Sequence, residues 1–280
     1  MKPKNTRADL HIYSRHSERA ADWVLRRLDF PASYSDPKDL YSALRGAGMD
    51  FVTITDQNTI SGCLEIAHLP GVILGEEVSA HFPDDECRIH VLTWGITEAQ
   101  HRTIQEARKN IFDLQEYLFA ENIAHSVAHP FHSVNGMLTA IHLQKLILLF
   151  RHFEGVNGRY CQLLSQTAQS VLGGLTPRDI EIFSSRTGLA PTHDEAWKKI
   201  FTGGSDDHGG THAGSAYTET DMSAIVEDFL ENIREGRCHA GGKSGTPLAM
   251  AHSTYSTAFE FAKARLPLKP GDPTMSLLEK

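Results

Sequence analysis

The sequence predicts an α/β fold with parallel strands, because short β-type apolar runs alternate with helix-like stretches along most of its 280 residues. The predicted strands are residues 8–13, 51–55, 72–78, 88–95, 124–128, 153–157 and 200–205. Strands that are separated by helical segments are typical of parallel βα units rather than of an antiparallel sandwich. Polar segments with His and Asp also end several of these runs, which is the pattern of a barrel whose strand ends meet at one mouth.

Helical segments occupy the intervals between the predicted strands. The clearest one covers residues 98–122, where Ile104, Ala107, Ile111 and Leu114 recur at steps of three and four and so form one apolar stripe. Several of the other helices open with an Asp, Ser or Thr cap. These shorter helices are predicted at residues 39–46, 143–150, 177–187 and 222–235.

We expect a single domain, because no stretch is rich enough in Gly, Pro or Ser to act as a linker and no internal repeat is visible. Residues 1–245 are predicted to form the barrel. Residues 246–266 are predicted to form a C-terminal helix packed on it, which ends before Pro267. Residues 267–280 are then expected to be a flexible tail.

Composition excludes several classes of protein. The formal net charge of −8 argues against an extended nucleic-acid surface, although it leaves room for a small cationic pocket. The four cysteines include no CxxC pair, so neither a disulfide framework nor a zinc ribbon is indicated. The N-terminus lacks the apolar core of a signal peptide, and no apolar run approaches the length of about 20 residues that spans a bilayer. We therefore expect a cytoplasmic protein without a membrane partner.

Four polar segments at the ends of β-type runs carry the candidate chemistry. They are Asp9-Leu10-His11, Thr55-Asp56-Gln57-Asn58, His129-Pro130-Phe131-His132 and Ser205-Asp206-Asp207-His208. A zinc finger keeps its ligands close together in the sequence, because they must fold one small module. A barrel enzyme takes one or two ligands from each of several strands, so widely spaced His and Asp residues indicate a metal centre assembled by the fold.

Spacing within these segments supports the same hypothesis. Side chains alternate between the two faces of a strand, so His11 and Tyr13 point the same way, as do Asp206 and His208. The two glycines before Ser205 would let the backbone approach an ion or substrate closely.

Three further positions contribute to a multi-metal hypothesis. Glu76 and Glu77 are adjacent carboxylates at the end of an apolar run, which is costly unless one is solvated and the other is paired or metal-bound. Either could bridge two cations, and a salt-bridged loop edge is the alternative. His90 lies inside a β run, as a ligand or as a hydrogen-bonded core residue. His129 precedes Pro130, which predicts an extended backbone at that strand end.

Taken in order, these motifs resemble the PHP (polymerase and histidinol phosphatase) family of metal-dependent phosphoesterases, over roughly residues 8–242. The resemblance implies a distorted, TIM-like (β/α)7 barrel and a hydrolase with two or three divalent ions, zinc, manganese or iron. It also implies metal ligands at matching positions. The first ion would use His11, Tyr13, Glu77 and Asp206, the second Glu77, His90 and His129, and the third Glu18, Gln57 and His208.

Three of these positions depart from the family pattern. Tyr13 and Gln57 stand where the family usually has His, and Glu18 stands where it commonly has Asp. A phenol with a pKa of about 10 is a poor ligand until a metal ionises it. An amide oxygen is a hard ligand that suits manganese or magnesium better than zinc. The second set keeps all its ligands, whereas the first is weakened and the third is depleted.

The function predicted from these residues is the hydrolysis of phosphoester bonds, as a phosphatase or a phosphodiesterase. Asp56 and His132 are candidate proton shuttles or orienting residues, and Asp56 could instead cap the following helix. Arg159 is a candidate phosphate contact, or else a solvated loop charge. We expect a phosphorylated small molecule or short nucleotide as substrate and no stable nucleic-acid partner. The alternatives are a degenerate PHP domain that binds metal or ligand with little catalysis, and hydrolysis of a non-phosphate bond.

Overall fold

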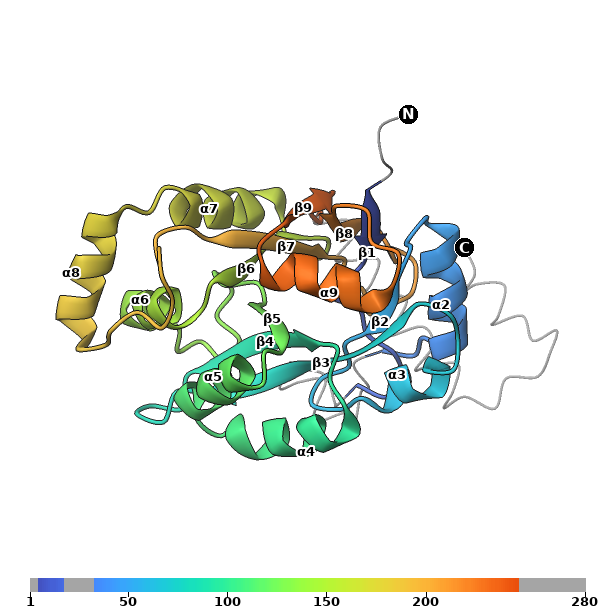
Figure 1. Cartoon of the computed structure of the whole chain (residues 1–280), viewed down its shortest axis with the longest axis horizontal. Coiled ribbons are helices and arrows are strands. Elements are labelled where there is room, and N and C mark those ends of the chain that lie inside the picture. The colour runs from blue at the N-terminus through green and yellow to red at the C-terminus, as the bar shows by residue number, and fades with distance from the viewer. Residues whose placement is uncertain (1–4, 18–32, 247–280) are drawn as a thin grey trace, which may run out of the picture.

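The computed structural model describes residues 5–17 and 33–246, which form a mixed α/β structure with two sheets (Figure 1). The first sheet has six strands in the order β2-β3-β4-β5-β6-β7, and the second has three in the order β1-β8-β9. The strand bounds are β1 (Thr6–Ala8), β2 (Val52–Ile54), β3 (Val72–His81), β4 (Arg88–Trp94), β5 (Ala124–Val127), β6 (His152–Asn157), β7 (Ile200–Gly204), β8 (Ala216–Thr220) and β9 (Cys238–Gly242).

The six-stranded sheet is mixed rather than parallel. Strand β2 pairs in parallel with β3, and β5, β6 and β7 also run parallel to one another. Strand β4, however, is antiparallel to both β3 and β5, and its register with β3 extends from Gly75↔Trp94 to His81↔Arg88. The expectation of parallel units throughout is wrong at this strand. The reason is that residues 82–87 are too few for a helical crossover and can only form a hairpin connection.

Helices follow most of the strands. Their bounds are α2 (Pro37–Gly46), α3 (Ser61–Ile66), α4 (Glu98–Ala107), α5 (Ile111–Ala120), α6 (Ala140–Leu149), α7 (Gln162–Gly173), α8 (Pro177–Thr187) and α9 (Val226–Arg234). The single helix predicted at residues 98–122 is in fact α4 and α5, because the side chain of Asn110 accepts a hydrogen bond from the Phe112 amide and starts a new helix. The helix and tail predicted at residues 246–266 and 267–280 lie almost entirely outside the described residues.

The segment that follows β1 lies between the two edge strands of the six-stranded sheet. The carbonyl of Ile12 accepts a 2.8 Å hydrogen bond from the amide of Thr55, beyond β2, and the amide of Tyr13 donates to the carbonyl of Asp207, beyond β7, at 3.1 Å. Beyond β1, this segment forms only the isolated bridge Ile12↔Asp207. The strand predicted at residues 8–13 therefore overlaps a regular strand only where β1 ends. The sheet is curled into a half-barrel, and the full (β/α)7 barrel stays a prediction.

Apolar packing stabilises the curled shape of the six-stranded sheet. The largest cluster of buried side chains joins β3, β4 and β5 to the helices α4, α5 and α6, which include Ile104, Leu114 and Leu146. Trp94 at the end of β4 is fully buried, and its indole Nε1 donates to the carbonyl of Leu10 at 3.0 Å. This contact ties β4 to the segment after β1 and so helps to position His11. Within the described helices, none combines the length and apolar character needed to cross a membrane.

Candidate metal centre

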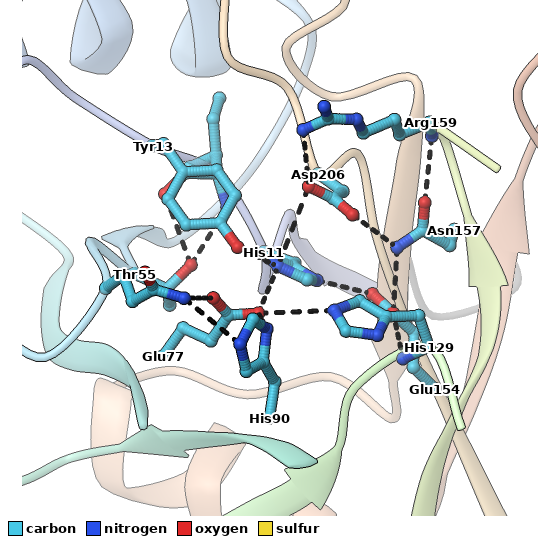
Figure 2. Close-up of polar contacts among 12 residues, drawn as sticks. His11, Tyr13, Thr55, Glu77, His90, His129, Glu154, Asn157, Arg159 and Asp206 are labelled. Atoms are coloured by element: carbon cyan, nitrogen blue, oxygen red, sulfur yellow. Dashed lines mark hydrogen bonds and ion pairs between the residues drawn. The ribbon is translucent and has the colours of Figure 1, made fainter. Parts of the chain in front are cut away.

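Five side chains from different strands, or from the segments that follow them, converge and are buried together (Figure 2). Glu77 and His90 belong to the neighbouring strands β3 and β4, whereas the other three follow β1, β5 and β7. They are His11, Glu77, His90, His129 and Asp206, and none is more than 8% exposed. The sequence expectation that these residues meet at one site agrees with this geometry.

Glu77 lies at the centre of the cluster. Its Oε1 atom is 2.9 Å from Nδ1 of His90, 3.2 Å from Nε2 of His11 and 3.4 Å from Nε2 of His129. Despite these short distances, Oε1 has no hydrogen-bond partner within the described part of the chain, and neither has Nδ1 of His129. A buried carboxylate oxygen that faces three ring nitrogens without aligned N–H bonds is the arrangement expected around a shared cation.

Two groups of three residues have ligand atoms spaced for a metal ion. One consists of Glu77, His90 and His129, and the other of His11, His129 and Asp206, with the atoms of each group within 4.8 Å of one another. Imidazole and carboxylate ligands suit zinc, manganese and iron. These donor atoms, together with the orphaned Oε1 of Glu77, fit divalent metal ions.

The charges of the cluster are set by burial and by mutual contacts. Burial raises the pKa of Glu77, but the charge of His90 and the nearby rings of His11 and His129 outweigh it and hold that pKa well below its ordinary value. Burial lowers the pKa of His11, but the Glu154 and Asp206 carboxylates outweigh it and raise that pKa well above its ordinary value. Binding of a metal ion by His11 would therefore release a proton.

Strand alternation decides between the two adjacent glutamates. Glu76 faces away from the cluster, and its carboxylate contacts Nδ1 of His101 at 2.8 Å and accepts from Nε2 of Gln105 at 2.7 Å. Glu77 alone of the pair faces His90. Of the two, only Glu77 lies in the cluster, and its role as a bridging ligand stays a prediction.

Sequence reasoning missed Glu154, a buried carboxylate in β6 that holds the cluster in place. Its Oε1 is 2.8 Å from Nδ1 of His11, and its Oε2 accepts hydrogen bonds from the His129 amide and from Nδ2 of Asn157, both at 2.8 Å. The same Nδ2 of Asn157 is 3.0 Å from Oδ2 of Asp206. The available signal was an acidic residue in the middle of an apolar β run, which needs a buried partner.

Tyr13 and Gln57, which replace two family histidines, contact the cluster without belonging to either group of three. The hydroxyl of Tyr13 is 2.8 Å from Nε2 of His11. Burial, followed by the charges of Glu77 and Asp206, raises the pKa of Tyr13 well above its ordinary value, so the phenol is neutral. Nε2 of Gln57 lies 3.1 Å from Nε2 of His90 and 3.4 Å from Oε2 of Glu77. Their roles as metal ligands stay predictions.

The residues of the third predicted set are not brought together in the described structure. Glu18 lies outside the described residues. Gln57 contacts His90 and Glu77, whereas His208 contacts Arg159, Asp206 and the ring of Tyr13 at a centroid distance of 4.1 Å. Burial and the charge of Arg159 lower the pKa of His208 to about 3, which keeps its imidazole neutral.

The three residues predicted to assist catalysis have different surroundings. Asp56 is buried and accepts hydrogen bonds from the amide and hydroxyl of Ser14, both at 2.6 Å, and burial raises its pKa to about 6. Its alternative role as a helix cap is wrong, because the N-cap of α3 is Ile60. The ring centroid of His132 lies 5.5 Å from that of His129, and burial lowers the pKa of His132 to about 4. Arg159 lies beside Asp206, at 3.8 Å.

Backbone geometry at two ligand positions is unusual. His129 has a backbone φ of 28° and Asp206 a φ of 50°, values that residues other than glycine rarely adopt. The extended backbone expected at His129 is therefore wrong. Gly204, two residues before Asp206, also differs from expectation, because a Cβ at this position would lie 2.3 Å from Cβ of His11. Gly204 thus makes room for a ligand residue rather than for an ion or substrate.

A family model described as PHP-associated matches residues 195–238, which contain Asp206 and His208. The PHP resemblance is confirmed. Among curated proteins, an uncharacterized protein from Methanocaldococcus jannaschii is 34% identical over 77 residues, which are 26% of this chain and 43% of that protein. This chain therefore matches less than half of that relative's length.

Solved structures resemble this chain in fold. PsfC from Pseudomonas syringae aligns with a TM-score of 0.51 at 12% identity, over 93% of this chain and 99% of that one. The lesion-specific endonuclease PfuEndoQ from Pyrococcus furiosus aligns with a TM-score of 0.51 at 15% identity, over 85% of this chain and 58% of that one. At these identities the likeness concerns the fold alone.

Proposed function

We propose that this chain is a metal-dependent hydrolase of phosphoester bonds that holds two divalent ions in the cluster around Glu77. The observation that carries the proposal is the orphaned Oε1 of Glu77, which three ring nitrogens approach within 3.4 Å without hydrogen bonding to it. The confirmed PHP resemblance and the endonuclease among the structural neighbours agree with a reaction at phosphorus. The proposal includes a closed barrel, in which the segment after β1 supplies the missing strand.

The protein groups around the cluster have distinct roles in this proposal. Divalent ions bound there would supply Lewis acidity and neutralise charge on a phosphoryl group. Glu77, His90 and His129 would hold one ion, and His11, His129 and Asp206 would hold the other. Glu154 fixes the ring of His11 and the backbone of His129. A neutral His132 beside His129 is placed to accept a proton.

The substrate that we propose is a phosphorylated small molecule or a short nucleotide. The net charge of −8 opposes a long nucleic acid, because its many phosphates need a basic surface. Carboxylate and imidazole ligands leave zinc, manganese and iron as candidate ions. The endonuclease neighbour favours including diesters as well as monoesters in any assay.

A degenerate PHP domain is the second candidate, and one contact favours it. The Tyr13 hydroxyl lies 2.8 Å from Nε2 of His11, which is the nitrogen that faces Glu77. A phenol that hydrogen-bonds to this nitrogen competes with a metal ion for it. Metal binding at the group of His11, His129 and Asp206 would then be weak, and catalysis slow or absent.

Metal analysis combined with a substrate panel tests the proposal. The purified chain is loaded with Mn²⁺ or Zn²⁺, and its metal content is compared with its turnover of an aryl phosphate, a bis-aryl phosphate and short dinucleotides. We expect metal-dependent turnover that a chelator abolishes and added Mn²⁺ restores. A folded, metal-loaded chain that is inert on every ester would reject the phosphoesterase and favour the degenerate domain. A chain that takes up no metal would reject the centre itself.

A further inference from the structure

His208 offers no free nitrogen to a third metal ion. Its Nδ1 lies 3.0 Å from the carbonyl oxygen of Asp206, a hydrogen bond in which Nδ1 must be the donor. The other ring nitrogen, Nε2, is only 2.7 Å from Nη1 of Arg159, which also lies 2.9 Å from Nδ1. A guanidinium nitrogen is a donor and never an acceptor. The lone pair that a metal would need is therefore used by Arg159.

Gln57, the other described member of the predicted third ligand set, does not contact His208. The amide of Gln57 contacts His90 and Glu77, and no hydrogen bond joins it to His208 within residues 5–17 and 33–246. The two described members of the third set, Gln57 and His208, thus do not form a metal site with each other, in contrast to the two groups around Glu77 and His129.

Arg159 is held in this position by the loop that follows β6. Its amide donates to Oδ1 of Asn157 at 2.9 Å, while Nδ2 of Asn157 donates to Oδ2 of Asp206 at 3.0 Å. The guanidinium itself lies 3.8 Å from the other oxygen of Asp206, and the side chain is 30% exposed (Figure 2). It therefore touches the metal cluster on one side and the solvent on the other.

We infer that the guanidinium of Arg159 is the third cation of this centre, and that the chain binds two exchangeable metal ions rather than three. The inference rests on the proposed function, because the third cation of such a centre would contact a phosphoryl oxygen of the substrate. A guanidinium suits that role, since it is always charged and its N–H groups match two oxygens of a phosphate. Unlike a metal ion, it cannot be removed by a chelator.

Metal stoichiometry is the first test. The chain is equilibrated with Mn²⁺ by dialysis, and tightly bound ions are counted by elemental analysis. We expect two tight ions per chain, and three would overturn the inference while leaving the proposed function intact. No bound ion would instead contradict the proposed function, so the two failures are distinguishable. A count of two ions would also result if the replacements at Tyr13 and Gln57 had removed ligands of a third ion. The charge of Arg159 therefore needs its own test.

Two variants of Arg159 separate a cationic role from a merely structural one. Arg159→Met removes the positive charge beside Asp206, which should tighten Mn²⁺ binding about tenfold or admit a third ion, because a repelling charge is lost. Arg159→Lys retains a charge and should stay within about threefold of the wild type. Weaker Mn²⁺ binding in Arg159→Met, measured by calorimetry on protein with an unchanged circular dichroism spectrum, would show that Arg159 only positions Asp206 and would overturn the inference.

Discussion

Glu154 and His11 are joined by a 2.8 Å hydrogen bond between Oε1 and Nδ1, and both side chains are shielded from solvent. The carboxylate fixes the proton on Nδ1, so the lone pair or second proton of the ring is at Nε2, which faces Glu77. The same carboxylate accepts from the His129 amide through Oε2. One residue thus orients two of the proposed ligands, although it belongs to neither group of three.

Glu154→Gln should weaken metal binding without unfolding the protein. A glutamine keeps the shape of the side chain but loses the negative charge that stabilises the His11 N–H. We expect the affinity for Mn²⁺ or Zn²⁺ to fall about 10- to 100-fold, as for other residues that orient metal ligands. Affinity is measured by competition with a chelating dye.

Glu76→Gln is the matched control for this substitution. It removes a buried carboxylate from the opposite face of β3, where the partners are His101 and Gln105. Metal affinity should not change in this variant. If both variants lose affinity equally, the effect is a general loss of buried charge and the orienting role of Glu154 is wrong.

His129→Ala should empty both metal positions, because His129 contributes a ligand atom to both groups. We expect a loss of both tight ions and of all ester hydrolysis, read by elemental analysis and an aryl phosphate assay. His125→Ala is the control, since His125 lies in β5, the strand that His129 follows, but its Nδ1 contacts the carbonyl of Ile123. Full activity in His129→Ala would contradict the site.

Tyr13→Phe tests whether the Tyr13 hydroxyl competes with a metal ion or binds it. If the hydroxyl competes with a metal for Nε2 of His11, its removal should raise metal affinity severalfold. If Tyr13 is a ligand, as the family resemblance implies, the same variant should bind metal more weakly. We expect the increase, because the pKa of Tyr13 is raised and a neutral phenol is a poor ligand. Tyr117→Phe in α5 provides a control for the loss of a hydroxyl.

Gly204→Ala should destabilise the protein, because the added methyl group would lie 2.3 Å from Cβ and 2.6 Å from the backbone nitrogen of His11. The backbone of one segment must shift, at a cost of about 1–3 kcal/mol in the free energy of unfolding. Gly173→Ala in α7 is the control, since its methyl group would have no neighbour nearer than 3.8 Å. An unchanged melting temperature in Gly204→Ala, beside an unchanged control, would remove the argument for this close approach.

The sequence predicted strands well where they are apolar and β-branched, as in β2 to β7. It missed β8 and β9, because residues 216–220 are largely polar and residues 238–242 are rich in glycine. The apolar period of residues 98–122 continues through the break at Asn110, so the pattern alone could not divide that helix. The antiparallel direction of β4 was set by the short connection at residues 82–87, which the strand count did not weigh.

Motifs at strand ends predicted the cluster around Glu77 for a similar reason. His11, His129 and Asp206 stand just after β1, β5 and β7, where a barrel brings strand ends together, so their position in the pattern implies proximity. Glu154 gave no such signal, because it lies inside a strand and only its partners explain its burial. The contact between Arg159 and His208 joins residues 49 apart in the sequence, and no local pattern encodes such a pair.

Acid sensitivity is expected from a histidine far from the metal cluster. His152 at the start of β6 is buried, and its Nε2 lies 2.7 Å from the carbonyl of Ile233. Burial, together with the nearby His125, lowers its pKa to about 3 from an ordinary value of 6.5. Between those two values the unfolded chain binds a proton that the folded chain does not. The free energy of unfolding must therefore fall as the pH is lowered through this window.

His152→Gln should flatten this dependence, since an amide can still donate to the Ile233 carbonyl but does not titrate. A single such histidine contributes a slope of up to about 1.4 kcal/mol per pH unit, so the variant should lose less stability than the wild type between pH 6.5 and pH 4. Urea unfolding at several pH values, with chelator present, measures the difference. His68→Gln, at an exposed position after α3, should keep the wild-type slope. Parallel stability curves for wild type and His152→Gln would show that His152 is not held neutral in the fold.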